Sequence, residues 1–421
     1  MNVRRSLSRI RGAARAERDR ISAEKEWAAM PATRRKPGPY EVILYFPDNV
    51  TNLYQVRQWY GPLRELDRQV RTVVLTRQVT AAAAIGSECP VDVEYLPAIE
   101  DVELFVADNN VKMFLYVNNN NRNMSMLRFA DAVHVSICHG ESDKSYMVSG
   151  VHNAFDFALI AGEAAARRLG KAFLHYDVQE RTRQIGRPQL DCIQPPPIFV
   201  RSDDRKIIFY APTWEGDRRS MRYGSLATHG ERILRALTAS DRYRLIVRVH
   251  PRSGVDQPEY RAAIARTRKL LQAANKADPG AGHIWDMTPH LDWQFGVADA
   301  CISDISAVAV DWLATLKPMV ITEPVEPEAQ GMGGFLESMD LLKPADADRL
   351  PAILDEMLVG TDYQERMAPW AAHYFGDTAP GQQLRRWVDA CIEIMRTRDK
   401  LDELRQERRS RSDGLTSARA H

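Results

Sequence analysis

The sequence predicts an α/β protein built from two Rossmann-like domains. From residue 37 onward, short apolar runs alternate with helical stretches, a pattern typical of mostly parallel sheets covered on both faces. This alternation stops at the Gln-Pro-Pro-Pro segment of residues 194–197 and then starts again, which indicates a stiff connector between two units. With 421 residues, the chain is also too long for one ordinary core.

The apolar runs give the expected strands, and the segments with helical periodicity give the expected helices. In the first unit, strands are expected at residues 41–46, 72–76, 91–96, 112–117, 131–137 and 155–160, with helices at 54–66 and 124–130. In the second unit, strands are expected at 206–210, 243–249 and 283–287 and in the apolar runs that begin at Ala300 and after Pro318. Helices are expected there at 226–237, 259–274, 348–359 and 381–400, and residues 374–377 are expected to form a turn.

These elements divide the chain into five parts. We expect a basic helical arm (1–37), an N-terminal Rossmann-like domain (38–195), a C-terminal Rossmann-like domain (196–375), a C-terminal helix (376–404) and a disordered tail (405–421). The arm carries eleven Arg and Lys residues against four acidic residues. It is either a solvated, frayed segment or a basic helix that rests on anionic lipid, and the residues leave both interpretations open.

Composition excludes several classes of protein. Hydrophobic residues make up 44% and charged residues 27%, which is typical of a globular chain, and no apolar run approaches the ~18 residues of a membrane span. No apolar segment of a signal peptide follows the basic N-terminus, so we expect a cytoplasmic protein. A net charge of +1 does not indicate nucleic-acid binding. Five widely spaced cysteines indicate neither zinc nor a redox motif, and we expect them to be reduced.

Polar residues follow several of the expected strands. His139-Gly140 follows one strand, Arg248 and His250 alternate at the end of another, and the segment Ser303-Asp304-Ile305-Ser306 follows a third and precedes a helix. The carboxyl ends of parallel strands meet at one edge, where ligands bind. A histidine suits proton transfer near neutral pH, and a serine turn before a helix suits a phosphate, although each is more often structural, a serine as a helix cap.

The motifs His139-Gly140, Ala211-Pro212-Thr213-Trp214, Arg248-Val249-His250-Pro251 and Ser303-Asp304-Ile305-Ser306 resemble, in the same order, those of the CDP-glycerol glycerophosphotransferase family of teichoic acid primases and polymerases. The likeness covers roughly residues 130–395. It implies a GT-B fold, in which two Rossmann-like domains face a cleft and the C-terminal helix crosses back to the first domain. It also implies CDP-glycerol as donor, a lipid-linked or cell-wall polymer as acceptor, release of CMP, and a peripheral location at the inner face of the cell membrane.

The resemblance further implies roles for individual residues. His139 would be the base near the acceptor hydroxyl, with Gly140 and Lys144 on the acceptor side, and His250 would contact the donor diphosphate. The other residues expected to bind the nucleotide and its phosphates are Thr213, Arg248, Arg252, Ser303, Asp304 and Ser306. No tightly bound cofactor is expected; Mg²⁺ is possible without a fixed site, and Asp304 without a second carboxylate more readily braces its turn.

The chain departs from the family pattern at Ile305 and Ala307, where a Tyr and a second Ser are usual. It also has Glu141-Ser142-Asp143-Lys144 after the His-Gly pair and residues 324–334 in place of an acidic and aromatic stretch. Two alternatives therefore stay open. One is a GT-B glycosyltransferase or capsule-polymer enzyme that uses a nucleotide sugar, and the other is a non-catalytic, membrane-associated scaffold. The sequence leaves open the donor alcohol, the acceptor, the choice between primase and polymerase, and the oligomeric state.

Overall fold

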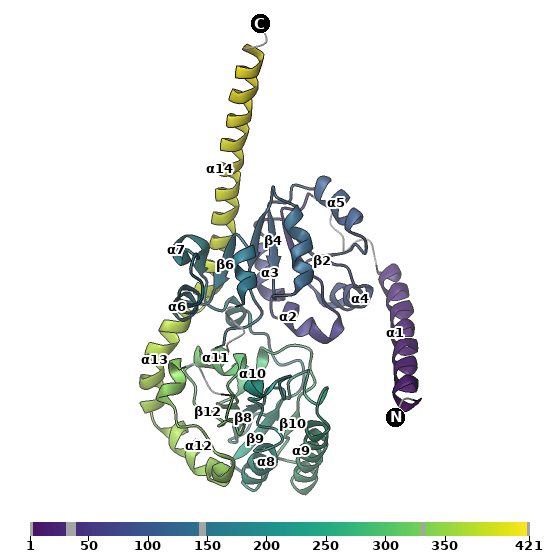
Figure 1. The fold of residues 1–421 in the computed structure, drawn as a ribbon. Helices are drawn as coiled ribbons and strands as arrows, with labels where there is room; N and C mark the ends of the chain where they lie inside the picture. Colours follow the sequence, from purple (N-terminus) through teal and green to yellow (C-terminus); the bar gives the residue numbers. More distant parts are fainter. Residues whose placement is uncertain (1–2, 31–38, 143–148, 330–332, 419–421) are drawn as a thin grey trace.

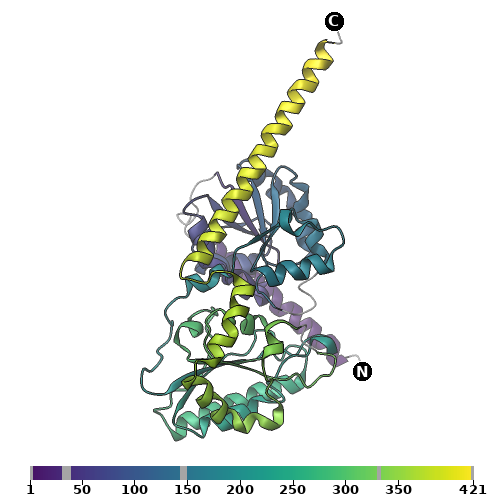
Figure 2. The same ribbon diagram turned by 90° about the vertical axis from the view of Figure 1, so that its left-hand side faces the viewer.

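The computed structural model describes residues 3–30, 39–142, 149–329 and 333–418, with side chains described from residue 14 and up to residue 410 in the first and last helices. Two α/β domains lie one above the other, and a long C-terminal helix runs up the side of the N-terminal domain and projects beyond it (Figure 1). The view turned by 90° shows the same helix crossing from the lower to the upper domain (Figure 2).

The N-terminal domain contains a seven-stranded sheet in the order β3-β2-β1-β4-β5-β6-β7, with every pair of neighbours parallel. Its strands are β1 Val42–Phe46, β2 Thr72–Thr76, β3 Asp92–Tyr95, β4 Met113–Tyr116, β5 Val133–Ser136, β6 Phe157–Ile160 and β7 Thr182–Gln184. Every residue of β1, β2 and β4 is buried, because β-branched, leucine and aromatic side chains pack on both faces of a covered parallel sheet.

Helices surround this sheet: α1 Val3–Ala29, α2 Leu53–Arg57, α3 Tyr60–Leu66, α4 Val79–Glu88, α5 Ile99–Ala107, α6 Glu163–Ala172 and α7 Val178–Arg181, with 3₁₀ helices η2 Val50–Asn52, η3 Asn121–Arg128, η5 Gly150–Ala154 and η6 Pro188–Cys192. The helix expected at residues 54–66 is in fact two short helices, α2 and α3, and the one expected at 124–130 is the 3₁₀ helix η3. Helix α1 packs on α4 through Ala23, Val79 and Ala83.

The C-terminal domain contains a five-stranded parallel sheet in the order β10-β9-β8-β11-β12. Its strands are β8 Lys206–Ala211, β9 Tyr243–Val247, β10 Ile284–Trp285, β11 Ala300–Ser303 and β12 Met319–Ile321. Its helices are α8 Gly230–Thr238, α9 Pro258–Ala277, α10 Trp293–Val297, α11 Ala307–Leu313, α12 Leu350–Val359 and α13 Asp362–Phe375, with η7 Arg219–Met221, η8 Gly334–Ser338 and η9 Pro344–Arg349. The two parallel α/β sheets confirm the predicted fold class.

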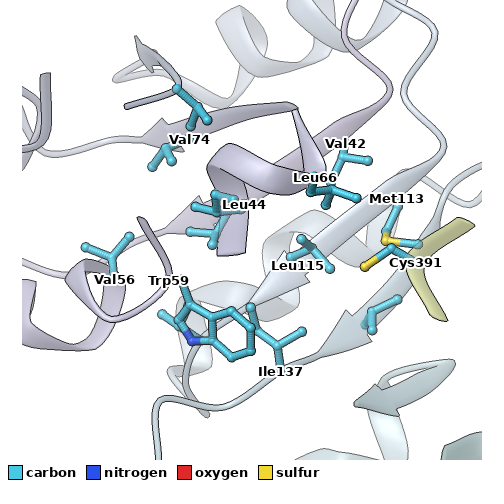
Figure 3. Close-up of a cluster of buried hydrophobic side chains, with 14 of the residues drawn as sticks. Val42, Leu44, Val56, Trp59, Leu66, Val74, Met113, Leu115, Ile137 and Cys391 are labelled. Carbon is cyan, nitrogen blue, oxygen red and sulfur yellow. The ribbon is translucent and has the colours of Figure 1, made fainter. Parts of the chain in front are cut away.

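Helix α14, Gln382–Ala418, starts beside the C-terminal domain and packs on the N-terminal one. Its Trp387 is fully buried, lies 4.9 Å from Trp59 between ring centroids, and donates a hydrogen bond from Nε1 to the Pro62 carbonyl at 3.0 Å. Figure 3 shows Cys391 of α14 beside Met113 in the same buried cluster as Trp59.

Two expectations about the C-terminal region are wrong. Residues up to Phe375 belong to the long helix α13, and the turn follows at Gly376, which has a φ of 67°. Helix α14 also continues to Ala418, where the sequence analysis expects a disordered tail from residue 405. Arg405 stabilises this extension because it pairs with Asp402 one turn earlier and with Asp131 of the N-terminal domain.

Candidate active site

A cavity of about 640 Å³ lies between the carboxyl ends of the two sheets and is lined by both domains. His139 enters it from the loop after β5. Several of the residues predicted from the sequence line it from the C-terminal domain, namely Thr213, Arg248, His250, Arg252 and Ser306. The structure therefore brings the polar ends of separate strands into one interdomain site.

The loop after β5 holds the His139 ring in one orientation. Its Nδ1 lies 2.9 Å from the carbonyl oxygen of Val117, and because a carbonyl can only accept, the Nδ1–H must donate. The neutral ring then has its lone pair on Nε2. Burial of the ring lowers the His139 pKa below its usual value of 6.5, which favours this neutral form.

The turn that carries His139 is conformationally unusual. Cys138 has a φ of 51°, in the left-handed region that residues other than glycine rarely adopt. The indole Nε1 of buried Trp59 donates to the Cys138 carbonyl at 2.8 Å and holds the turn in place. The core of the N-terminal domain therefore fixes the position of His139.

The loop after β9 holds the His250 ring in the opposite way. The backbone N–H of Arg252 donates to His250 Nδ1 at 3.1 Å, so the neutral ring carries its proton on Nε2 and can donate it. The ring stacks on Trp214, and the Arg252 guanidinium lies 3.8 Å from the Trp214 ring centroid. A hydrogen-bond donor and a cation thus face the cavity from one loop.

Tyr54 of α2 lies between the two histidines. Its ring contacts that of His139 with centroids 5.8 Å apart and that of His250 with centroids 5.3 Å apart, both edge to face. The phenol is largely buried, and this burial raises its pKa. Tyr54 therefore brings the two imidazoles to the same part of the cavity as a neutral, rigid spacer.

Arg248 is fixed by two acceptors from the neighbouring strand end. Its Nη1 donates to Asp286 Oδ2 at 2.7 Å and to the Thr288 carbonyl at 2.8 Å. Asp286 is itself fully buried and accepts from Gln294 Nε2. These contacts hold the guanidinium at the cavity wall, where a cation suits an anionic ligand.

The serine turn after β11 lies mostly behind the cavity wall. Ser303 and Asp304 are fully buried and do not line the cavity, so the structure does not place them where the sequence analysis expects phosphate ligands. Asp304 Oδ2 accepts the backbone N–H groups of Thr213 at 2.7 Å and Ser225 at 3.0 Å, and its Oδ1 accepts the Thr322 hydroxyl at 2.6 Å. Burial raises the Asp304 pKa. This carboxyl group braces the loop that carries Thr213.

Ser306 does reach the cavity and also caps helix α11. Its Oγ accepts the backbone N–H of Ala309 at 3.3 Å and lies 3.1 Å from Ser303 Oγ, which donates or accepts there. Gly140, which the sequence predicts on the acceptor side, lies against Ala307, since a Cβ at Gly140 would come within 3.0 Å of the Ala307 Cβ. Lys144 lies outside the described residues.

Three residues that support the site are not among the predicted site residues. Glu215 is buried and accepts the backbone N–H groups of Gly254, Asp256 and Gln257 at 2.9–3.2 Å, which fastens the loop after β9. Arg187 and Asp311 form a buried pair between the domains. Their partners are distant in sequence, so local patterns do not reveal them.

Among the described residues, no group of three His, Cys, Asp or Glu side chains could hold a metal ion.

A comparison with protein-family models tests the resemblance seen in the sequence motifs. Residues 116–325 match the model of the CDP-glycerol:poly(glycerophosphate) glycerophosphotransferase family. This segment belongs to that family. It contains the His139 and His250 loops, Thr213 and the serine turn, the residues on which the sequence resemblance rests. No curated protein sequence matches the chain.

Solved structures with the same architecture confirm the GT-B fold. The wall teichoic acid polymerase TagF superposes with a TM-score of 0.55 at 14% identity, over 94% of this chain and 97% of that one. A UDP-GlcNAc 2-epimerase from Neisseria meningitidis gives 0.54 at 10% identity, over 84% and 100% of the two chains. A glycosyltransferase from Rickettsia africae gives 0.51 at 12% identity, over 86% and 100%.

Proposed function

We propose that this glycerophosphotransferase family member transfers glycerol phosphate, or a related polyol phosphate, from CDP-glycerol to a hydroxyl of a lipid-linked or cell-wall polymer and releases CMP, in teichoic-acid-like polymer synthesis. One observation carries the proposal: His139 and His250 line the same cavity from opposite domains, and their Nδ1 atoms are held in opposite ways, one donating to a backbone carbonyl and the other accepting a backbone N–H. In transfer of a phosphoryl group between two oxygens, a base can take the proton of the attacking hydroxyl, and hydrogen-bond donors can stabilise the negative charge on the phosphate oxygens.

The proposed reaction uses these groups in a single displacement at phosphorus. The acceptor oxygen attacks the glycerol-bearing phosphorus and forms a new P–O bond, while the bond from that phosphorus to the bridging oxygen breaks. His139 Nε2 takes the proton of the acceptor hydroxyl, and the bridging oxygen leaves with CMP. Negative charge that accumulates on the phosphate oxygens is met by the His250 Nε2–H, Arg248 and Arg252.

The direct test incubates the purified chain with CDP-glycerol or CDP-ribitol and a lipid-like acceptor, and measures CMP. We expect CMP release with one of these donors, its near loss in His139→Ala, and no change in His175→Ala, a matched control at an exposed histidine of the same domain. Absence of CMP with both donors, together with tighter binding of UDP than of CMP or CDP, would instead favour a nucleotide-sugar glycosyltransferase. Intact cellular function in both His139→Ala and His250→Ala would favour a scaffold.

A membrane location is the second part of the proposal, and uneven charge along α1 supports it. Residues 14–29 hold four basic and four acidic side chains, and Arg20 pairs with Glu17 and Glu24. Residues 1–13 hold four arginines and no acidic residue. The second half of α1 packs on α4, and the sequence of residues 1–13 carries the excess positive charge that would attract anionic lipid, at about 1 kcal/mol per cation. No helix in the described part of the chain is long and apolar enough to span a bilayer.

Vesicle co-sedimentation tests this part. The chain should bind vesicles rich in anionic phospholipid more strongly than zwitterionic ones, and replacement of Arg4, Arg5, Arg9 and Arg11 by Gln should remove most of the difference. Arg15→Gln with Arg18→Gln, in the charge-balanced half, is the matched control and should bind as the wild type does. Equal binding by both variants would contradict a role for the first half of α1.

A further inference from the structure

A buried ion pair joins the two domains beside His139. Arg187 follows β7 in the N-terminal domain, and Asp311 lies on α11 in the C-terminal domain. The guanidinium donates twice to the carboxylate, from Nε to Oδ1 at 2.8 Å and from Nη2 to Oδ2 at 3.1 Å, and the two residues are only 4% and 7% exposed. A forked pair of this kind fixes distance and orientation together.

Further contacts hold Arg187 in place. Its backbone N–H donates to Gln383 Oε1 at 2.8 Å at the start of α14, and its Nη2 also donates to Gln58 Oε1 at 3.1 Å. Gly186 has a φ of 71°, and a Cβ at this position would come within 2.6 Å of Gln383 Oε1, so only glycine fits. The side chain therefore has one available position, at the junction of both domains and the crossover helix.

The elements that carry this pair also touch the His139 turn. Arg187 lines a small cavity of about 40 Å³ together with Cys138 and Gly140, the residues on either side of His139. Gly140 contacts Ala307 at the start of α11, the same helix that bears Asp311 one turn further on. Movement of α11 would therefore act directly on the loop that holds the imidazole.

The Arg187–Asp311 pair also influences the protonation of His139 through its charges. Burial lowers the His139 pKa most, and the positive charge of Arg187 lowers it further, while the hydrogen bond to the Val117 carbonyl and the Asp48 carboxylate oppose this shift. The Tyr54 ring contacts His139, and the His250 ring lies on the far side of Tyr54. Cys138 and Glu141 flank it along its own loop, and Glu141 pairs with Arg168. Asp311 partly neutralises Arg187, so the effect of the guanidinium depends on its partner.

We propose that Arg187 and Asp311 are positioning residues that hold the His139 turn against the C-terminal domain and keep the lone pair on His139 Nε2 available for the acceptor proton. The catalytic consequence rests on the proposed function. The consequence for His139 itself does not, because it is a property of the folded chain.

Two variants that break the same ion pair should act on His139 in opposite directions. Arg187→Gln removes the positive charge, so His139 should hold its proton to higher pH, and the acid limb of the activity profile should move up by about one pH unit. Asp311→Asn leaves the guanidinium unneutralised, so the acid limb should move down. Arg187→Lys keeps the positive charge but cannot make both hydrogen bonds to the Asp311 carboxylate. This variant should lower kcat without moving the acid limb of the activity profile.

Controls separate this effect from loss of folding. Arg187→Met combined with Asp311→Leu replaces the buried pair by apolar side chains, which often restores stability; its acid limb should still move up. Arg244 is fully buried and forms a forked pair with Asp203 at the opposite end of the C-terminal sheet, with N–O distances of 2.9 and 2.7 Å. Arg244→Gln should therefore lower stability and leave the limb in place.

A spectroscopic readout keeps the test independent of turnover. The His139 ring can be titrated by NMR with histidine labelled at Cε1, its signal assigned by its loss in His139→Asn. Opposite displacements of this titration in Arg187→Gln and Asp311→Asn are the expected result. Displacements of the same sign, or none, would overturn the proposal even in a chain that releases CMP, whereas a chain that shows the displacements but releases no CMP would overturn only the proposed reaction.

Discussion

The loops that carry His139 and His250 are alike in position and opposite in chemistry. Each follows a buried parallel strand and presents an imidazole to the same cavity. In one loop Nδ1 faces a carbonyl, and in the other it faces a backbone N–H. The backbone atom opposite Nδ1 thus decides whether Nε2 accepts or donates a proton. Two similar strand ends can therefore supply the two complementary roles of a group transfer.

The largest effect should follow replacement of His139 by Asn. The Asn side-chain nitrogen can still donate to the Val117 carbonyl, as Nδ1 does, but nothing remains to accept the acceptor's proton. We expect kcat to fall by about 10²- to 10⁴-fold with little change in the affinity for CDP-glycerol. Single-turnover kinetics with equilibrium binding would check this, and weakened donor binding would contradict the separation of roles.

At His250 the corresponding comparison is between Ala and Gln. Loss of a hydrogen bond to a charged phosphate costs about 1.5–3 kcal/mol, so His250→Ala should lose roughly 10- to 150-fold in kcat/KM. A Gln amide can donate near the position of Nε2, and His250→Gln should recover part of this loss, whereas His139→Gln should recover none. Equal activity of the Ala and Gln variants at position 250 would show that the Nε2 proton is not used.

A smaller effect is expected from Glu215, which supports the His250 loop without reaching the cavity. Glu215→Gln keeps the shape but weakens three hydrogen bonds to the backbone N–H groups of Gly254, Asp256 and Gln257. We expect a rise in KM for the donor of about tenfold or less, with the acid limb set by His139 unchanged. Steady-state kinetics across pH would measure both, and a displaced limb would be evidence against the assignment.

The smallest effect on activity is expected at a third histidine, His283, which repeats the His250 arrangement away from the cavity and acts on stability instead. Its Nδ1 accepts the Leu245 N–H at 3.1 Å, and burial, with Arg205 and Arg244 nearby, lowers its pKa from 6.5 to about 4. Because the unfolded chain binds this proton more readily, the stabilisation is present above pH 6.5 and is lost as the pH falls through 4. Urea unfolding should show a loss on the order of 1–3 kcal/mol, and His283→Asn should reduce it.

The sequence predicts the location of the site better than the orientation and protonation of its side chains. Apolar runs locate the strands, and the polar residues after them, His139 and His250 among them, locate the site because parallel strands end at one edge. The position of the proton on the His139 ring cannot be predicted from the sequence, because the carbonyl that faces its Nδ1 belongs to Val117, which follows a different strand. Ser303 and Asp304 carry the expected polarity, but both are fully buried behind the cavity wall, where Ser303 donates to the Ala211 carbonyl and Asp304 accepts from Thr213, Ser225 and Thr322.

The missed elements have physical reasons as well. Strand β7 has only three residues, Thr182–Gln184, too few for a period to appear, and Arg187 follows it. Helix α13 contains Pro369, and because proline usually signals a break, the sequence predicts no helix at these residues. Tyr54 is an aromatic residue on a short helix, a pattern that indicates a core position, although its ring lines the cavity and contacts His139.

The return of α14 to the N-terminal domain has a mechanical consequence. The polypeptide passes between the domains twice, once through residues 185–197 and once through 376–381, where Gly376 and Gly381 both have positive φ. Two covalent crossings restrain twisting and separation far more than one, so the domains can swing only about the line that joins these two points. Relative motion of the two domains is therefore expected to be a hinge-like opening about this line, in which each half keeps its own internal geometry.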